Sequence, residues 1–77
     1  MTKRGIAKKV LLENFREKGI ALDDIKPEDN LRELGFDSLD TMEAIMELEN
    51  IFTVRIKNSE IAKVRTVQDV YNLFVKE

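Results

Sequence analysis

The chain contains no cysteine and no histidine. The absence of cysteine excludes disulfides, thiolate metal sites and a cysteine nucleophile. The absence of histidine removes the side chain that most often acts as a general base or a metal ligand. A serine hydroxyl is a weak nucleophile without a neighbouring base, so the composition argues against an enzyme that forms its own acyl intermediate. We therefore predict a protein that is not an enzyme and that has no metal site.

Long apolar segments are missing as well. No run approaches the ~18 residues of a membrane span, and the basic residues near the start are followed by no apolar segment of a signal peptide. We expect a cytoplasmic protein that does not insert into membranes. Seventy-seven residues suffice for one domain, which we place over residues 1–77 and expect to be monomeric.

Charge is distributed unevenly along the chain. Residues 1–22 hold six basic and two acidic residues, a net charge of +4, whereas residues 23–49 hold ten acidic and two basic residues, a net charge of −8. Residues 50–77 hold five basic and three acidic residues, a net charge of +2. The acidic middle would repel the phosphates of nucleic acid. It would attract proteins with basic surfaces and speed their encounter.

Apolar periodicity and capping residues predict four helices. We expect them over residues 2–18, 38–51 and 60–64 and from residue 66 onward, with a loop over 20–37 and an extended connector over 53–58. The expected N-caps of the last three are Asp37, Ser59 and Thr66, and Gly19 ends the first helix. Leu12 falls on the polar side of that helix, where we expect it to be exposed. The predicted fold class is all-α, a four-helix bundle of three longer helices and one short helix with a long first connection.

The second predicted helix has two different faces. The acidic residues Asp40, Glu43 and Glu47 form a stripe on one side, and we also place Ala44 on the exposed side. Apolar residues cover the other half of the helix: Leu39, Met42, Ile45, Met46, Leu48 and Phe52. Ser38 is the first helical residue. A serine there is usually only part of a cap, but a phosphate attached to it would lie where free N–H groups and the helix dipole favour an anion.

The segment from residue 34 to residue 49 reads LGFDSLDTMEAIMELE. It resembles the modification-site region of acyl carrier proteins. The similarity extends over nearly the whole chain, because the basic-edged first helix and three further motifs occur in the same order: Ile25-x-Pro27, Phe52-x-x-x-Ile56 and Thr66-Val67-x-Asp69-Val70.

The resemblance implies that Ser38, flanked by Asp37 and Leu39, receives 4′-phosphopantetheine from coenzyme A through a phosphopantetheinyl transferase. The thiol of this arm would carry acyl groups as thioesters to acyl transferases, ketoacyl synthases and related enzymes of fatty-acid, lipid or polyketide synthesis. Basic patches of these enzymes would bind the second helix through Asp37, Leu39, Asp40, Glu43, Met46, Glu47 and Glu49. A cavity for the acyl chain would be lined by Met42, Ile45, Met46, Ile56, Ile61, Ala62 and Tyr71.

One segment departs from the pattern of many fatty-acid carriers. Arg55 and Lys57 follow the second helix, where those carriers continue with acidic residues. A specialised member of the family is therefore one interpretation, and the pathway stays open, including a D-alanyl or aminoacyl carrier.

Classes other than carriers are also considered. The main alternative is a helical interaction module without a prosthetic group. A calcium-binding protein is disfavoured because the acidic groups at 23–30 and 37–43 do not match the spacing of a calcium loop. A helical DNA-binding domain is disfavoured by the acidic second helix.

Overall fold

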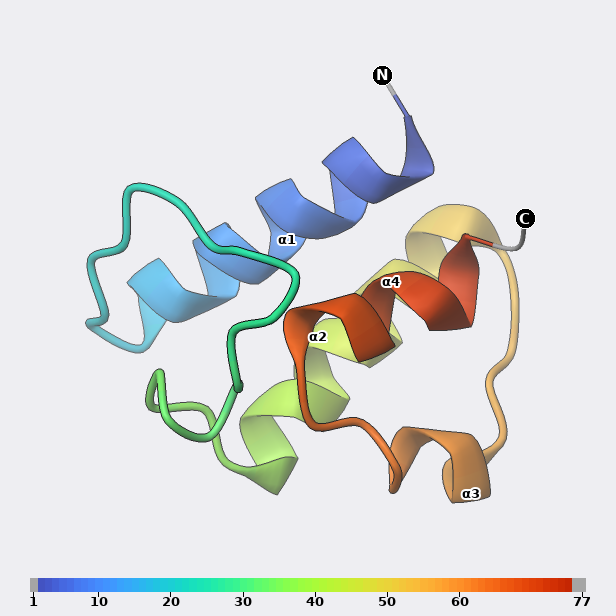
Figure 1. Ribbon diagram of the computed structural model, residues 1–77. Coiled ribbons are helices and arrows are strands. Elements are labelled where there is room, and N and C mark those ends of the chain that lie inside the picture. Colours follow the sequence, from blue (N-terminus) through green and yellow to red (C-terminus); the bar gives the residue numbers. More distant parts are fainter. Residues whose placement is uncertain (1, 76–77) are drawn as a thin grey trace.

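The computed structural model describes residues 2–75. It contains four helices, which are α1 (Lys3–Glu17), α2 (Ser38–Phe52), α3 (Asn58–Ile61) and α4 (Val67–Phe74). Helix α1 packs against both α2 and α4, while the one-turn helix α3 stands apart at the end of the connector from α2 (Figure 1). The predicted all-α fold, with one short helix and a long first loop, is confirmed. No helix within residues 2–75 is long and apolar enough to cross a membrane.

The predicted ends of α1 are also confirmed. The hydroxyl of Thr2 at the N-cap accepts a hydrogen bond from the N–H of Gly5 at 3.0 Å. Gly19 has φ of +91°, in the left-handed region that glycine adopts without strain. The chain can therefore reverse its direction at Gly19, and the N–H of Ile20 donates to the carbonyl of Phe15 at 2.8 Å.

Helix α3 is where the prediction is wrong. We expected Ser59 to cap a helix over 60–64, but α3 begins at Asn58, and the preceding Lys57 makes no capping bond with its side chain. A single turn has too few hydrogen bonds to define its own ends, so its position depends on its neighbours. The chain leaves the helix at Ala62, and the guanidinium of Arg65 donates to the carbonyl of that residue.

The face that α2 turns to the core also differs from the prediction. Its buried residues are Thr41, Ala44, Ile45 and Leu48, at the i, i+3, i+4 and i+7 spacing of a helix stripe. The expectation that Ala44 is exposed is therefore wrong. Leu39, Met42 and Met46, expected on the apolar half, are exposed to 64%, 41% and 53%. Thr41 can be buried because its hydroxyl donates to the carbonyl of Asp37 at 3.0 Å.

The core continues into the long loop that precedes α2. Ile25, Leu31 and Phe36 are buried, and the ring of Phe36 stacks on that of Phe15 from α1 at a centroid distance of 3.8 Å. Leu12, expected to be exposed, is half-buried against this core. Apolar contacts therefore hold the loop in place although it has no helix of its own.

Backbone hydrogen bonds tie the same loop to the start of α4. The N–H of Leu31 donates to the carbonyl of Arg65 at 2.9 Å, and the N–H of Val67 donates to the carbonyl of Asp29 at 3.0 Å. Asn30 and Thr66 form an antiparallel bridge between these bonds. The segment just before α2 is thereby placed beside the segment that links α3 to α4.

Candidate functional site

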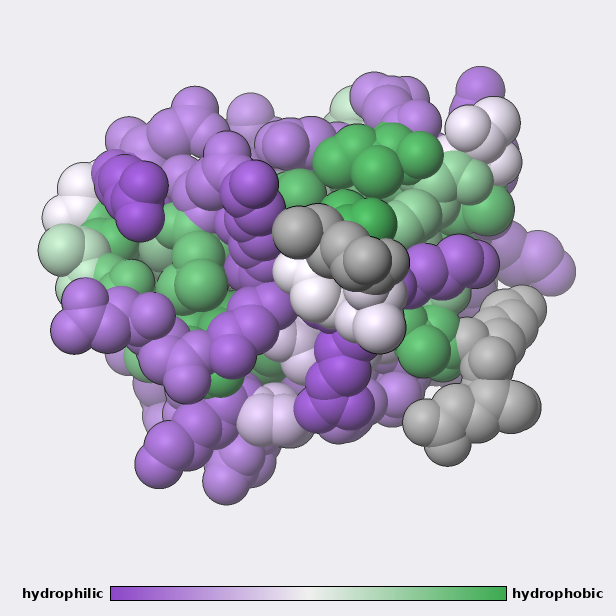
Figure 2. Space-filling view, turned by 90° about the horizontal axis from the view of Figure 1, so that it is seen from above, coloured by the Kyte–Doolittle hydropathy of each residue, from purple (hydrophilic) through white to green (hydrophobic). Residues whose placement is uncertain are grey.

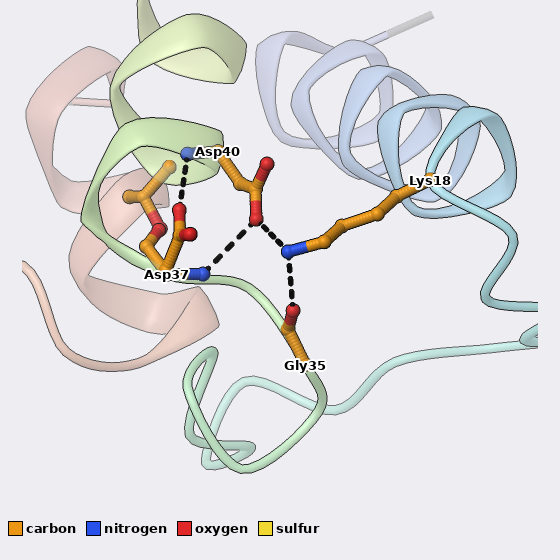
Figure 3. A network of polar contacts seen from close by, with 5 residues as sticks. Lys18, Gly35, Asp37 and Asp40 are labelled. Atoms are coloured by element: carbon orange, nitrogen blue, oxygen red, sulfur yellow. Dashed lines mark hydrogen bonds and ion pairs between the residues drawn. The ribbon is translucent and has the colours of Figure 1, made fainter.

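Ser38 is the first residue of α2, and its side chain is exposed. The start of the helix is closed by its neighbours. Asp37 accepts a hydrogen bond from the N–H of Asp40 at 2.9 Å, and the carboxylate of Asp40 accepts one from the N–H of Asp37 at 3.1 Å (Figure 3). The hydroxyl of Ser38 takes part in none of these capping bonds. The predicted cap at Asp37 is confirmed.

Lys18, the C-cap residue that follows α1, reaches the start of α2. The ammonium of Lys18 donates to the carbonyl of Gly35 at 2.9 Å and forms an ion pair with the carboxylate of Asp40 (Figure 3). The hydrogen bond from Lys18 lowers the pKa of Asp40, and the bond to Asp40 raises the pKa of Lys18. Lys18 is therefore held protonated, and it cannot serve as a base for Ser38.

Nothing in the sequence pattern indicated that Lys18 would contact Asp40. Lys18 lies 22 residues from Asp40 in the chain, so neither helical spacing nor a local motif relates the two. Gly35 is the one nearby residue in the sequence that indicates an unusual backbone conformation at this contact. Its φ is +111°, and a Cβ on it would lie 2.7 Å from the Cδ1 of Ile20. Glycine is needed for this close turn, which allows the Gly35 carbonyl to accept the bond from Lys18.

A pocket of about 560 Å³ adjoins Ser38, which contributes to its lining. The pocket lies between the loop before α2, the first turn of α2 and the segment around α3. Its apolar lining consists of Leu31, Phe36, Met42, Ile61, Ala62 and Val64. An attached arm and part of its cargo would thus find apolar surface immediately beside the serine.

The residues predicted for an acyl-chain cavity are only partly together. Met42, Ile61 and Ala62 line the pocket beside Ser38. Ile45 and Tyr71 are buried in the main core instead. The remaining two also lie elsewhere, since Ile56 is half-buried at the edge of the core and Met46 borders a different hollow near the end of α2.

Sequence reasoning did not anticipate the lining from Leu31, Phe36 and Val64. Leu31 was expected only to pin the loop to the core. Its place beside the pocket depends on the backbone bond to Arg65 rather than on any periodic pattern.

The acidic residues of α2 differ in their availability. Asp37, Glu43 and Glu47 are exposed, whereas Asp40 and Glu49 are half-buried. Three of the four carboxylates beyond the N-cap bond within the protein. Asp40 binds Lys18, Glu47 accepts from the amide of Asn14 at 3.2 Å, and Glu49 accepts from the N–H of Ile56 at 2.7 Å. The acidic side of α2 therefore also holds α1 and the connector.

Comparison with known proteins agrees with this arrangement. A family model described as a phosphopantetheine attachment site matches residues 9–74. The acyl carrier proteins of Chlorobium phaeobacteroides and Chlorobium phaeovibrioides are each 44% identical to the chain over 78 residues, covering 100% of both sequences.

Solved structures show the same likeness. The crystal structure of an acyl carrier protein from Thermotoga maritima has 34% identity and a TM-score of 0.76, covering 94% of this chain and 91% of that one. A putative acyl carrier protein from Mycobacterium tuberculosis has 28% identity and a TM-score of 0.81, covering 94% and 93%.

Proposed function

The chain belongs to the acyl carrier protein family, and from this premise we propose that Ser38 carries the 4′-phosphopantetheine arm. The protein is a carrier rather than an enzyme, and 4′-phosphopantetheine is its cofactor. The observation that carries the assignment to Ser38 is its exposed side chain at the first position of α2, left out of the cap and bordering a pocket. The site fits the group, because a phosphodiester requires an accessible hydroxyl and the arm requires space beside it.

The first turn of α2 suits an attached phosphate. Backbone N–H groups at a helix start lack partners within the helix, and the helix dipole favours an anion there. Asp37 and Asp40 oppose this by repulsion, but the ion pair with Lys18 neutralises Asp40. When attached, the arm supplies a thiol that holds the acyl group as a thioester. The residues of this chain hold the base of the arm and offer apolar surface to its cargo.

Partner enzymes would dock on the exposed side of α2. As an acyl carrier protein, the chain interacts with a phosphopantetheinyl transferase and with biosynthetic enzymes. We assign the contact to the exposed Leu39 and Met46, with Asp37, Glu43 and Glu47 facing basic patches. Exposed charge pairs add little affinity but speed the encounter. A carrier that must leave each enzyme quickly is served by such weak, rapidly formed contacts.

Arg55 and Lys57 favour a carrier that serves one fatty-acid, lipid or polyketide pathway. Both are exposed, and Arg55 borders the hollow that also contains Met46. Two cations at this end of the docking surface would repel the basic patch of a general malonyl transferase. Changing both residues to glutamate should therefore raise the rate of malonyl loading. An unchanged rate would remove this argument for specialisation.

Intact mass tests the attachment residue. The protein is incubated with coenzyme A, Mg²⁺ and a broad-range phosphopantetheinyl transferase, alongside Ser38→Ala and Ser59→Ala. Ser59 is a matched control, because it is also an exposed serine near a helix start. We expect the wild type and Ser59→Ala to gain one phosphopantetheine and Ser38→Ala to gain none. A gain by Ser38→Ala would place the arm on another residue.

A further inference from the structure

Two arginines line the pocket that contains Ser38. Arg32 comes from the turn before α2, and Arg65 comes from the segment before α4. The backbone bond from Leu31 to the carbonyl of Arg65 places the two segments side by side. Two arginines therefore contribute to a lining whose other residues are six apolar and five polar ones, with Asp37 among the polar residues.

Arg65 is held in a defined position. One terminal nitrogen of its guanidinium donates to the carbonyl of Ala62 at 2.9 Å and to that of Val64 at 3.0 Å. Its backbone N–H donates to the carboxylate of Asp69 at 2.9 Å. A guanidinium has five N–H donors, and these contacts leave the remaining nitrogens for a ligand.

Among residues 2–75, neither guanidinium forms an ion pair with a carboxylate. Within the described part of the chain, the ion pairs are Lys8–Asp24 and Lys18–Asp40. Asp37 also lines the pocket, but one oxygen of its carboxylate caps the N–H of Asp40. The charged side chains of the lining are therefore two arginines and one aspartate, a net charge of +1, and this excess positive charge favours a bound anion.

We propose that Arg32 and Arg65 form a subsite for an oxyanion carried by the arm on Ser38. Arginine binds both phosphate and carboxylate through paired N–H donors. The oxyanion is therefore either the phosphodiester at the base of the arm or a carboxylate at the end of an acidic acyl group. This inference rests on the proposed attachment at Ser38, and it goes further by assigning a chemical preference to the pocket.

A matched pair of cargoes separates the two sources. The wild type is loaded by the transferase with the arm alone, with a hexanoyl arm or with an adipyl arm. The adipyl group has the same number of carbons as the hexanoyl group but ends in a carboxylate. Intact mass confirms each loading. Nitrogen-15 NMR follows the side-chain Nε–H resonances of Arg32 and Arg65, and hydroxylamine measures how accessible each thioester is.

Shifts of both resonances on attachment of the arm alone would assign the phosphodiester. Shifts that appear only with adipyl, together with a roughly two- to fivefold slower cleavage than for hexanoyl, would assign the carboxylate, as expected for charge pairs at a partly exposed site. In the double variant Arg32→Gln/Arg65→Gln, the difference between the cleavage rates of the adipyl and hexanoyl thioesters should vanish. Arg16→Gln removes an exposed arginine outside the pocket, and the difference in cleavage should remain in this variant.

The outcomes distinguish this inference from the proposed function. Complete loading by mass, with no shift of either resonance and equal cleavage in wild type and double variant, would overturn the subsite alone. Absence of any mass gain would overturn the attachment at Ser38 and the subsite with it. Arg32→Gln by itself keeps the test available if the loss of the Arg65 contacts disturbs the fold, because it leaves those backbone contacts intact.

Discussion

Helices α2 and α4 begin with the same local structure and continue into opposite environments. Each has a capping box with an aspartate three residues after the cap, Asp37 with Asp40 and Thr66 with Asp69. The residue after the first cap, Ser38, is exposed, whereas the residue after the second, Val67, has 0% exposure. A cap therefore fixes where a helix begins, and the packing around it decides whether the next residue joins the core or stays available for modification.

The two aspartates at the third helical position also have different supports. The carboxylate of Asp69 accepts local backbone bonds, from the N–H groups of Arg65 and Thr66. Asp40 additionally binds Lys18, the C-cap residue of α1, which itself donates to the carbonyl of Gly35. The start of α2 is thus held by a contact distant in sequence, and the start of α4 by its own neighbours and by the loop that crosses it.

The largest expected effect comes from replacing the first residue of each of these helices, Ser38 of α2 and Val67 of α4, with alanine. Val67→Ala should lower the free energy of unfolding by roughly 1.5–3 kcal/mol, because a fully buried side chain is truncated. Ser38→Ala should change it by less than about 0.5 kcal/mol, as for an exposed position, while abolishing modification. Urea unfolding measures both variants. A large loss of stability in Ser38→Ala would give the serine a structural role and break the contrast.

Removing the cap residues should have a similar cost at both helices. Asp37→Ala and Thr66→Ala each lose a side-chain acceptor and should cost about 1 kcal/mol by urea unfolding. Asp37→Asn retains an acceptor for the cap and should recover most of this loss, but it removes a charge that we assign to partner encounter. Its rate of modification should therefore stay below that of the wild type. Full recovery of the rate would limit Asp37 to capping.

Low pH should destabilise the starts of both α2 and α4, through a different carboxyl group at each helix. The hydrogen bond from Lys18 lowers the pKa of Asp40. Burial pushes the pKa of Asp69 upward, but N–H bonds from Thr66 and Arg65 outweigh it and hold that pKa below 3.8. A carboxyl group whose pKa is lowered in the folded state contributes its full stabilisation at pH values above the ordinary pKa of 3.8. Their contribution is lost as the pH falls through the folded-state pKa.

Thermal unfolding between pH 5 and pH 2.5 checks this prediction. Lys18→Met should remove part of the acid-dependent loss, and Asp69→Asn should remove another part. The two variants should act additively, because the sites share no partner. If neither variant flattens the pH profile, other carboxylates govern the acid sensitivity.

Added salt should produce the smallest difference in stability between the variants at the starts of α2 and α4. The pair of Lys18 and Asp40 lies at the surface, where dissolved ions screen it. The stability gap between wild type and Lys18→Met should therefore narrow from low salt to 1 M NaCl. The gap for Thr66→Ala should stay nearly constant, because its cap is a bond to a neutral hydroxyl. Equal responses of the two gaps would contradict the difference in support between α2 and α4.

Prediction from sequence succeeded where a structure depends on nearby residues. The caps Asp37 and Thr66, the turn at Gly19 and the position of Ser38 at the first residue of α2 follow from local hydrogen bonding and backbone conformation. It failed at α3, since one turn cannot define its own ends. It also misjudged the buried face of α2, where apolar residues occur on more than one side and only packing selects among them.

The sequence by itself determined the family, the starts of α1, α2 and α4 and the serine placed after a cap, because each depends on a short motif or on local spacing. The tertiary structure alone decided what surrounds that serine. It brought Lys18, at the end of α1, to Asp40, and it aligned Leu31 with Arg65 so that two arginines share the pocket with Ser38. The physical reason is that these contacts join residues far apart in the chain, whose meeting depends on how the loop packs into the core.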